Sequence, residues 1–297
     1  MNFRVILMLF LLMSGCLLQA QGFSWWNEIH NWDGHTHWTR YMILSAGYLG
    51  PNALPVPEIG KGILPKPRSF ELGLDGHYSK GDQTGNLFAE FFFPLFSERA
   101  GMGISYVPLE FYQTDTITRD IRRSREYDGK GVSTGDICFS TCIHLLEEAG
   151  RSPDILFTAN LRTASGSRLD GARHTDTPGY SFILSTGKVI YHGEGRLNSL
   201  RGYAMVGLYI YQTYLEQHRQ NDAFSYGFGF DINYKRVRIE NQYGGYIGYH
   251  NNGDRPMVYR LNMVWQLKPE WHLKFRFQQG FIDFPFTSVR ISTQFNF

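Results

Sequence analysis

Apolar and polar residues alternate one by one along most of the chain after residue 68. In the clearest stretch, 224–234, large apolar side chains take every second position and small or polar ones the positions between. A period of two puts the two sets on opposite faces of a strand, and a helix cannot bury such a pattern on one side. The pattern predicts twelve strands, at 69–79, 84–94, 99–112, 134–147, 153–164, 178–186, 200–213, 224–234, 237–243, 257–267, 271–278 and 289–297.

The connections between these strands alternate in length. The short ones are 95–98, 148–152, 235–236 and 268–270, and the longer polar ones are 113–133, 165–177, 214–222 and 249–255. Tight turns at one end and long loops at the other are typical of an outer-membrane barrel, with both termini on the periplasmic, short-turn side. Two connections fit less well, because 187–199 is long for a turn and 80–83 is short for a loop.

The alternation is also compatible with a soluble sandwich, whose apolar faces point inward. Here the polar faces carry several charges or amides, as at Arg238, Glu240 and Gln242, and the apolar faces carry large aromatics. About eleven residues tilted by about 40° span roughly 28 Å, close to the apolar band of a membrane barrel. We therefore predict an all-β fold for residues 69–297, a twelve-stranded antiparallel transmembrane β-barrel in the cell outer membrane.

The first twenty residues have the pattern of a signal peptide. Arg4 supplies a positive charge, an apolar run follows it, and Ala20 precedes a cleavage point, so that the mature chain begins at Gln21. The stretch 13–16 resembles a lipoprotein cleavage box and offers cleavage before Cys16 as the alternative.

Residues 21–68 do not alternate. They hold four of the six Trp and five of the twelve Pro residues of the chain. Proline at that density blocks the hydrogen bonds of a β-ladder. We expect this segment to be either a periplasmic extension or a plug folded into the lumen.

Charge and cysteine content exclude several classes of protein. The 297 residues include 29 Lys plus Arg against 27 Asp plus Glu, so no broad positive field attracts nucleic acid, and we expect no nucleic-acid partner. Three cysteines are too few for a disulfide scaffold or a four-cysteine zinc site. Cys138 and Cys142 on one strand are roughly 13 Å apart, too far for a disulfide.

The last eight residues resemble the C-terminal assembly signal of bacterial outer-membrane proteins. Arg290, Phe295 and Phe297 match its polar residue and its two aromatics, and Ser292 replaces the usual glycine. The resemblance implies that the barrel-assembly machinery of a Gram-negative cell inserts the chain among outer-membrane lipids.

A weaker resemblance covers about 135–188. Gly135-Asp136 opens one strand, Pro153-Asp154 begins the next, and 162–166 ends that strand before a long loop. This arrangement is similar to the outer-membrane proteins of meta-pathway phenol degradation and, more loosely, to the fatty-acid and aromatic-compound transporters. Those families end the strand with Pro-Thr-Gly, whereas this chain has Thr-Ala-Ser-Gly. The resemblance therefore does not identify the transported solute.

Two clusters carry residue types used in chemistry. His30, Asp33, His35 and His37 form the densest ligand-like group, but their spacing is not diagnostic of zinc or copper, and we predict neither a metal nor another cofactor.

The second cluster is His77, Ser79 and Asn86, which resembles the serine, histidine and asparagine of the outer-membrane phospholipases. In that family the serine attacks an acyl ester and faces lipid. Here Ser79 has the parity of inward polar residues such as Glu71, so a lumenal role is favoured over catalysis.

Charged residues with inward parity are the candidates for a lumenal site. Acids dominate the early strands and bases the late ones, which favours either an ion-pair network or a selectivity constriction. The candidates are Glu71, Asp75, Glu90, Arg238, Glu240, Arg260, Lys274, Arg276 and Arg290.

The barrel size suggests the function. Twelve strands lie between the filled eight-stranded barrels and the open porins of sixteen or more strands. We predict a narrow pore or facilitated-diffusion transporter for small molecules, apolar ones included, rather than an enzyme. The alternatives are an outer-membrane hydrolase and a structural or adhesive barrel. A continuous lumenal path favours transport, and a full plug favours the structural alternative.

Overall fold

The computed structural model describes residues 22–95 and 98–297, so the predicted signal peptide and both of its cleavage points lie outside the described residues. The chain divides into two units at Thr36 and His37. In the first unit, α2 (Ser24–Ile29) precedes a loop closed by Asp33. The second unit carries every strand that the structure describes.

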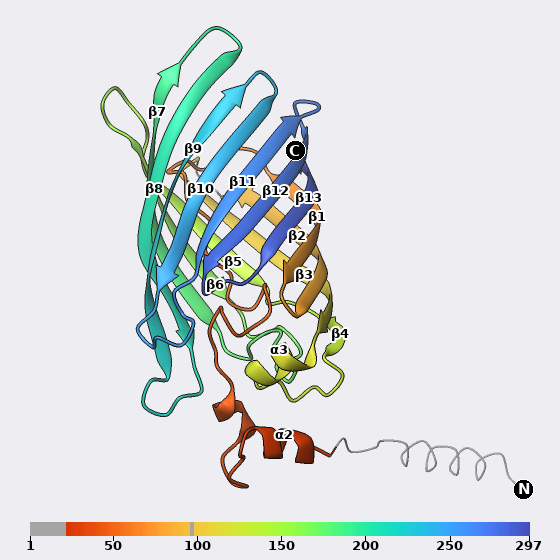
Figure 1. The fold of residues 1–297 in the computed structure, drawn as a ribbon. Coiled ribbons are helices and arrows are strands. Elements are labelled where there is room, and N and C mark those ends of the chain that lie inside the picture. The colour runs from red at the N-terminus through yellow and green to blue at the C-terminus, as the bar shows by residue number, and fades with distance from the viewer. Residues whose placement is uncertain (1–21, 96–97) are drawn as a thin grey trace, which may run out of the picture. The chain divides into compact units, whose positions relative to one another are not determined.

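The second unit is a closed antiparallel barrel (Figure 1). β1 pairs with β2 on one side and with β13 on the other, and β2 also pairs with β3, which closes the ring. The short β4 pairs with one end of β3 and leaves twelve strands in the ring. The strands are β1 (Ser69–Ser79), β2 (Asp82–Pro94), β3 (Ala100–Thr114), β4 (Lys130–Ser133), β5 (Cys138–Leu146), β6 (Asp154–Arg162), β7 (Gly179–His192), β8 (Leu197–Gln212), β9 (Gln220–Tyr234), β10 (Val237–Ile247), β11 (Met257–Gln266), β12 (Trp271–Ile282) and β13 (Thr287–Asn296).

The twelve-stranded barrel predicted from the sequence is confirmed, and each predicted strand overlaps one strand of the ring. The prediction of a long connection at 187–199 was wrong, because β7 continues to His192 and β8 already begins at Leu197. Register shifts after Val189 and after Leu197 mark bulges. A bulge inserts one unpaired residue and reverses the alternation, which hides the strand from a period-of-two count.

The helices of the structure are short. Besides α2, the described part of the chain contains η1 (Trp38–Tyr41) and α3 (Thr116–Ile121), the latter in the connection after β3. Asp115 caps α3 by accepting a hydrogen bond from the Thr118 amide at 2.7 Å, which lowers the pKa of Asp115. Over residues 22–95 and 98–297, no helix combines the length and the apolar character needed to cross a membrane.

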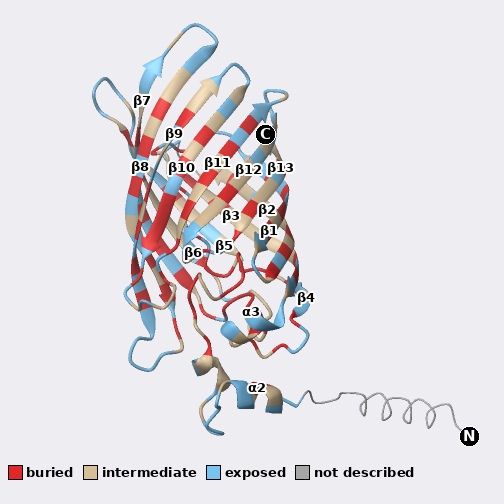
Figure 2. Ribbon diagram, viewed as in Figure 1, coloured by how far each residue is buried: buried red, intermediate tan, exposed pale blue. Residues whose placement is uncertain are grey.

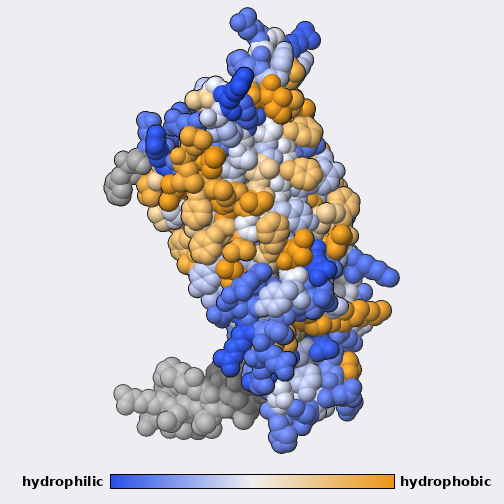
Figure 3. Space-filling model, turned by 90° about the vertical axis from the view of Figure 1, so that its left-hand side faces the viewer, coloured by the Kyte–Doolittle hydropathy of each residue, from blue (hydrophilic) through white to orange (hydrophobic). Residues whose placement is uncertain are grey.

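The barrel wall is apolar outside and polar inside. Along β7, Phe182 and Leu184 are exposed, while the alternating residues Ser181, Ile183 and Ser185 are buried (Figure 2). A band of hydrophobic residues crosses the face seen in Figure 3, with hydrophilic residues above and below it. Because the outer face is the apolar one, the wall suits contact with lipid rather than with water.

Candidate functional site in the lumen

Residues 42–64 lie inside the barrel, in the orange part of the chain in Figure 1. At the end with the long loops, the Gly47 amide donates to the Gly253 carbonyl at 3.1 Å, in the connection between β10 and β11. At the end with the short turns, the Phe297 amide donates to the Arg68 carbonyl at 2.9 Å. The chain therefore enters the lumen among the long loops and leaves it where β1 begins. We call residues 42–64 the lumenal segment.

The lumenal segment fills the long-loop half of the bore with an apolar cluster. Its side chains pack against inward-facing aromatic residues of the wall and of the connection between β12 and β13. The buried members include Met42, Leu44, Leu49, Leu54 and Val56 of the segment, and Tyr209, Tyr211, Tyr246, Val258, Phe284 and Phe286 around it. This half of the lumen is closed by well-packed side chains.

A buried ion network fastens the connection between β6 and β7 beside that cluster. The Arg173 guanidinium is fully buried and donates to Asp82 at 2.7 Å, to Glu110 at 2.9 Å and to Thr84 at 2.7 Å. The amide of Gly50, in the lumenal segment, donates to the carbonyl of Ala172, the residue before Arg173, at 2.9 Å. Sequence reasoning missed Arg173, because a loop residue carries no periodic signal that shows which way it points.

In the short-turn half, the lumenal segment follows one wall. The Gly62 amide donates to Ser185 Oγ of β7 at 3.3 Å. Lys61 forms ion pairs with Asp231 of β9 at 2.9 Å and with Glu240 of β10 at 2.5 Å. Because the lumenal segment is anchored to this wall, space remains in the lumen beside the opposite wall.

The opposite wall and Glu58 carry charges that water reaches. The Glu58 side chain is 63 % exposed and that of Arg276 is 24 % exposed, although both have inward positions. The Arg276 guanidinium donates two hydrogen bonds, of 2.7 and 2.8 Å, to the Glu58 carboxylate. Lys274 pairs with Glu71 above the same space. We call this water-accessible region the charged vestibule.

The structure brings most of the predicted lumenal charges into pairs. Asp75 lies directly opposite Arg290 in the β1–β13 register, with a bond of 2.8 Å. Arg238 contacts Glu240 at 2.8 Å. Arg260 instead donates to main-chain carbonyls of the lumenal segment, those of residues 56 and 57, at 2.7 and 2.9 Å.

Glu90 is the exception among these candidates. It is exposed and lies cross-strand from Glu71, so two carboxylates of β1 and β2 stand side by side on the vestibule wall.

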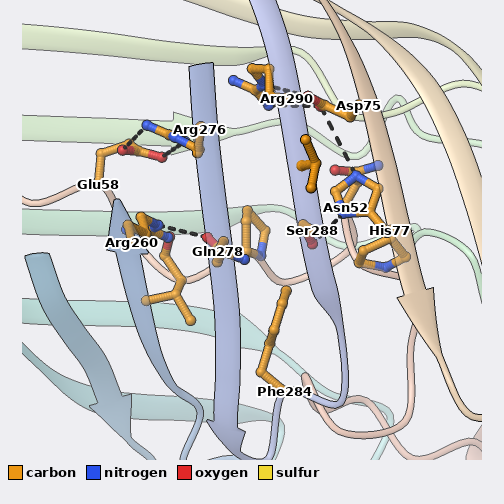
Figure 4. A pocket seen from close by; sticks show the side chains of 14 residues that line it. Asn52, Glu58, Asp75, His77, Arg260, Arg276, Gln278, Phe284, Ser288 and Arg290 are labelled. Atoms are coloured by element: carbon orange, nitrogen blue, oxygen red, sulfur yellow. Dashed lines mark hydrogen bonds and ion pairs between the residues drawn. The ribbon is translucent and has the colours of Figure 1, made fainter. Parts of the chain in front are cut away.

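A small cavity of about 80 Å³ separates the lumenal segment from β1 and β11–β13 (Figure 4). Asn52 and Glu58 line it on the side of the segment, and His77, Arg276 and Arg290 line it on the side of the wall. The cavity has room for a few water molecules beside charged groups. It is the narrow region between the vestibule and the apolar cluster.

Only two of the three residues of the hydrolase alternative, His77 and Asn86, come together. The His77 imidazole contacts Asn86 Oδ1 at 2.9 Å and Ser288 Oγ at 2.7 Å, all within the lumen. Ser79 Oγ points away and donates to the Asp82 carbonyl at 3.4 Å. The resemblance to a lipid-facing nucleophile does not extend to this geometry.

The ligand-like cluster before the barrel is a closed loop. The Thr36 hydroxyl and the amides of His35 and Thr36 donate to the Asp33 carboxylate and lower the pKa of Asp33 to about 2. In the part of the chain that the structure describes, no three His, Cys, Asp or Glu residues are grouped to hold a metal ion.

Comparisons with known proteins concern the fold. No family model matches the sequence, and no curated protein is similar to it in sequence. The KdgM porin is similar in structure at 10% identity, with a TM-score of 0.47 over 76% of this chain and 99% of that one. The COG4313 outer membrane channel from Pseudomonas putida F1 follows at 9% identity and 0.45, over 82% and 100%. The transport unit of the autotransporter AIDA-I from Escherichia coli has 6% identity and 0.49, over 83% and 94%.

The architecture fixes the location of the protein. A closed ring leaves no unpaired strand edge, and its exposed face is apolar, as at Leu74 and Phe228, which are 65% and 58% exposed. Closed barrels of this kind satisfy every backbone hydrogen bond within lipid. The protein is a β-barrel of the cell outer membrane.

Proposed function

We propose that the protein is a gated outer-membrane channel for small solutes, in which the lumenal segment is the gate. The observation that carries the proposal is the division of the bore. One half is closed by apolar packing, and the other is a charged vestibule open to water. A barrel that needed only a filled core would gain nothing from water-exposed charges such as Glu58.

The contacts that hold the gate support this function. Glu58 ties the lumenal segment to β12 through an ion pair that water reaches, and Lys61 ties it to the buried carboxylates of Asp231 on β9 and Glu240 on β10. A pair as exposed as Glu58–Arg276 contributes about 1 kcal/mol or less, whereas removing one partner of a buried pair such as those of Lys61 costs about 3–5 kcal/mol. The contact of Glu58 with β12 can therefore open at a low cost, while Lys61 holds the segment on β9 and β10.

Conductance of the purified protein in planar bilayers tests the proposal. The double variant Glu58→Gln/Lys61→Met removes both anchors, and we expect openings to become at least tenfold more frequent than in the wild type. The control is Lys188→Met, which removes a partly exposed lysine near the turn between β5 and β6. Absence of current from both proteins would favour the structural barrel instead.

We further propose that the solute is small, since the remaining cavity between segment and wall is about 80 Å³. The similarity of 135–188 to the phenol-degradation group makes aromatic solutes the first to test. We also propose that the assembly machinery recognises Arg290, Phe295 and Phe297.

A further inference from the structure

A second and larger cavity lies at the long-loop mouth, outside the charged vestibule. Its volume is about 340 Å³, and it is formed by residues 40–44 and by the connections after β8 and β10. Pockets that bind small molecules begin at about 300 Å³. This mouth cavity is therefore large enough for a compact organic ligand.

Three polar side-chain atoms of residues that line the cavity are buried from water and form no hydrogen bond with the described residues. Within the described ranges, the Tyr214 hydroxyl, His250 Nε2 and Asn252 Oδ1 are buried and have no hydrogen bond. Leaving a buried polar atom unpaired costs about 1–3 kcal/mol. The Tyr214 hydroxyl and the Nε2–H tautomer of His250 can donate to an acceptor atom of a ligand, whereas Asn252 Oδ1 can only accept.

The charge of the lining selects the kind of ligand. Arg40, Arg123, His218 and His250 line the cavity, and its lining includes no acidic residue. Arg40 pairs at the surface with Glu216, and Arg123 donates to the Tyr41 carbonyl at 2.8 Å. Even with these bonds, guanidinium and imidazole groups surround the space and favour an anion.

The remaining lining is apolar. Met42, Leu44 and Leu215 contribute hydrocarbon surface between the basic groups. An inorganic anion leaves this surface unfilled, whereas a carboxylate on a hydrocarbon body contacts both kinds of group.

We propose that the mouth cavity binds a small organic anion, a carboxylate carried on a compact apolar body. Its carboxylate accepts from the basic side of the cavity, and its hydrocarbon body covers Met42, Leu44 and Leu215. The site lies where the chain enters the lumen, so that it holds the ligand at the long-loop side of the proposed gate. Binding at this site does not require that the barrel conducts, and the two proposals fail separately.

Calorimetry with the purified full chain tests the site, with three probes of similar shape. Cyclohexanecarboxylate is expected to bind at least tenfold more tightly than cyclohexylmethanol or cyclohexylmethylamine. Asn252→Asp adds a negative charge to the lining and is expected to weaken carboxylate binding at least tenfold. Tyr214→Phe removes one unpaired hydroxyl and is expected to weaken it about threefold, while the exposed control His192→Ala leaves it unchanged.

Heat-modifiable migration identifies variants that still form the barrel, and only these are compared. Equal binding of the acid and the alcohol would overturn the anion assignment. Absence of saturable binding, or an equal loss in His192→Ala, would overturn the site itself.

Discussion

At the scale of the residue, parity along a strand decides which medium a side chain meets, but not how much room it has. Phe228 was predicted to face lipid and is 58% exposed on the outer wall. Gly229 alternates with Phe228 and so has lumenal parity, which alone indicates that a serine is tolerated. A Cβ at Gly229 would lie 2.5 Å from the Asn241 carbonyl oxygen and 2.8 Å from the Tyr203 ring. The sequence indicates the face, and only the packing shows the steric limit.

The first prediction concerns this lipid-facing position. Phe228→Arg puts a charge in the apolar band and should lower the free energy of unfolding by about 2–4 kcal/mol. Asn233→Arg places the same side chain on the lumenal face of the same strand, near the acid Asp231, and should cost much less. Urea unfolding in lipid vesicles measures both. An equal loss in the two variants would mean that charge on either face is equally unfavourable.

The second prediction concerns the terminal residue. The Phe297 ring stacks on the Phe91 ring of β2 with 6.2 Å between centroids, and the Phe297 amide donates a hydrogen bond to the Arg68 carbonyl. Deleting Phe297 should reduce the amount of heat-modifiable barrel in the outer membrane, while export across the inner membrane continues. Phe297→Tyr keeps a terminal aromatic ring and should assemble normally. Wild-type amounts of barrel in the deletion strain would refute the assembly signal.

At the scale of the element, the sequence predicts regular strands well and interrupted ones poorly. Alternation located each of the twelve strands of the ring, because each has lipid on one face and polar contacts on the other. It missed β4 (Lys130–Ser133), since four residues are too short for a periodic signal. The extension of β10 to Ile247 was also missed, because Gly244 and Gly245 contribute no apolar side chain to the count.

The third prediction belongs to β12, whose inward face carries Lys274 and Arg276. Replacing both with alanine leaves Glu71 and Glu58 without their ion-pair partners, beside Glu90, which forms no ion pair within the described ranges 22–95 and 98–297. Uncompensated carboxylates favour cations, so the reversal potential in a salt gradient should shift toward cation selectivity. The control Arg196→Ala/Lys235→Ala removes two positive charges from exposed turns at the same end. An identical shift in the control would show that overall charge, not the vestibule, sets the selectivity.

At the scale of the whole molecule, the arrangement inside the bore depends on contacts distant in sequence. Composition showed that residues 21–68 form no ladder, but prolines and tryptophans do not determine a path through a barrel. Lys61 meets Asp231, 170 positions later in the chain, and no local pattern encodes that pairing. The pairing of Asp75 with Arg290 was easier to predict from the sequence, because closing a ring places the first and last strands side by side.

The last prediction follows from the direction of the chain through the bore. Arg40 pairs with Glu216 in the connection after β8, so residue 37 lies at the long-loop end, whereas Lys66 lies near the short turns. With the short turns facing the periplasm, the long-loop end faces the outside of the cell. In a Cys138→Ser/Cys142→Ser background, His37→Cys should react with a membrane-impermeant maleimide in intact cells. Lys66→Cys should react only after the outer membrane is permeabilised. The opposite labelling pattern would mean that the chain threads the barrel in the other direction, or that the barrel is inverted in the membrane.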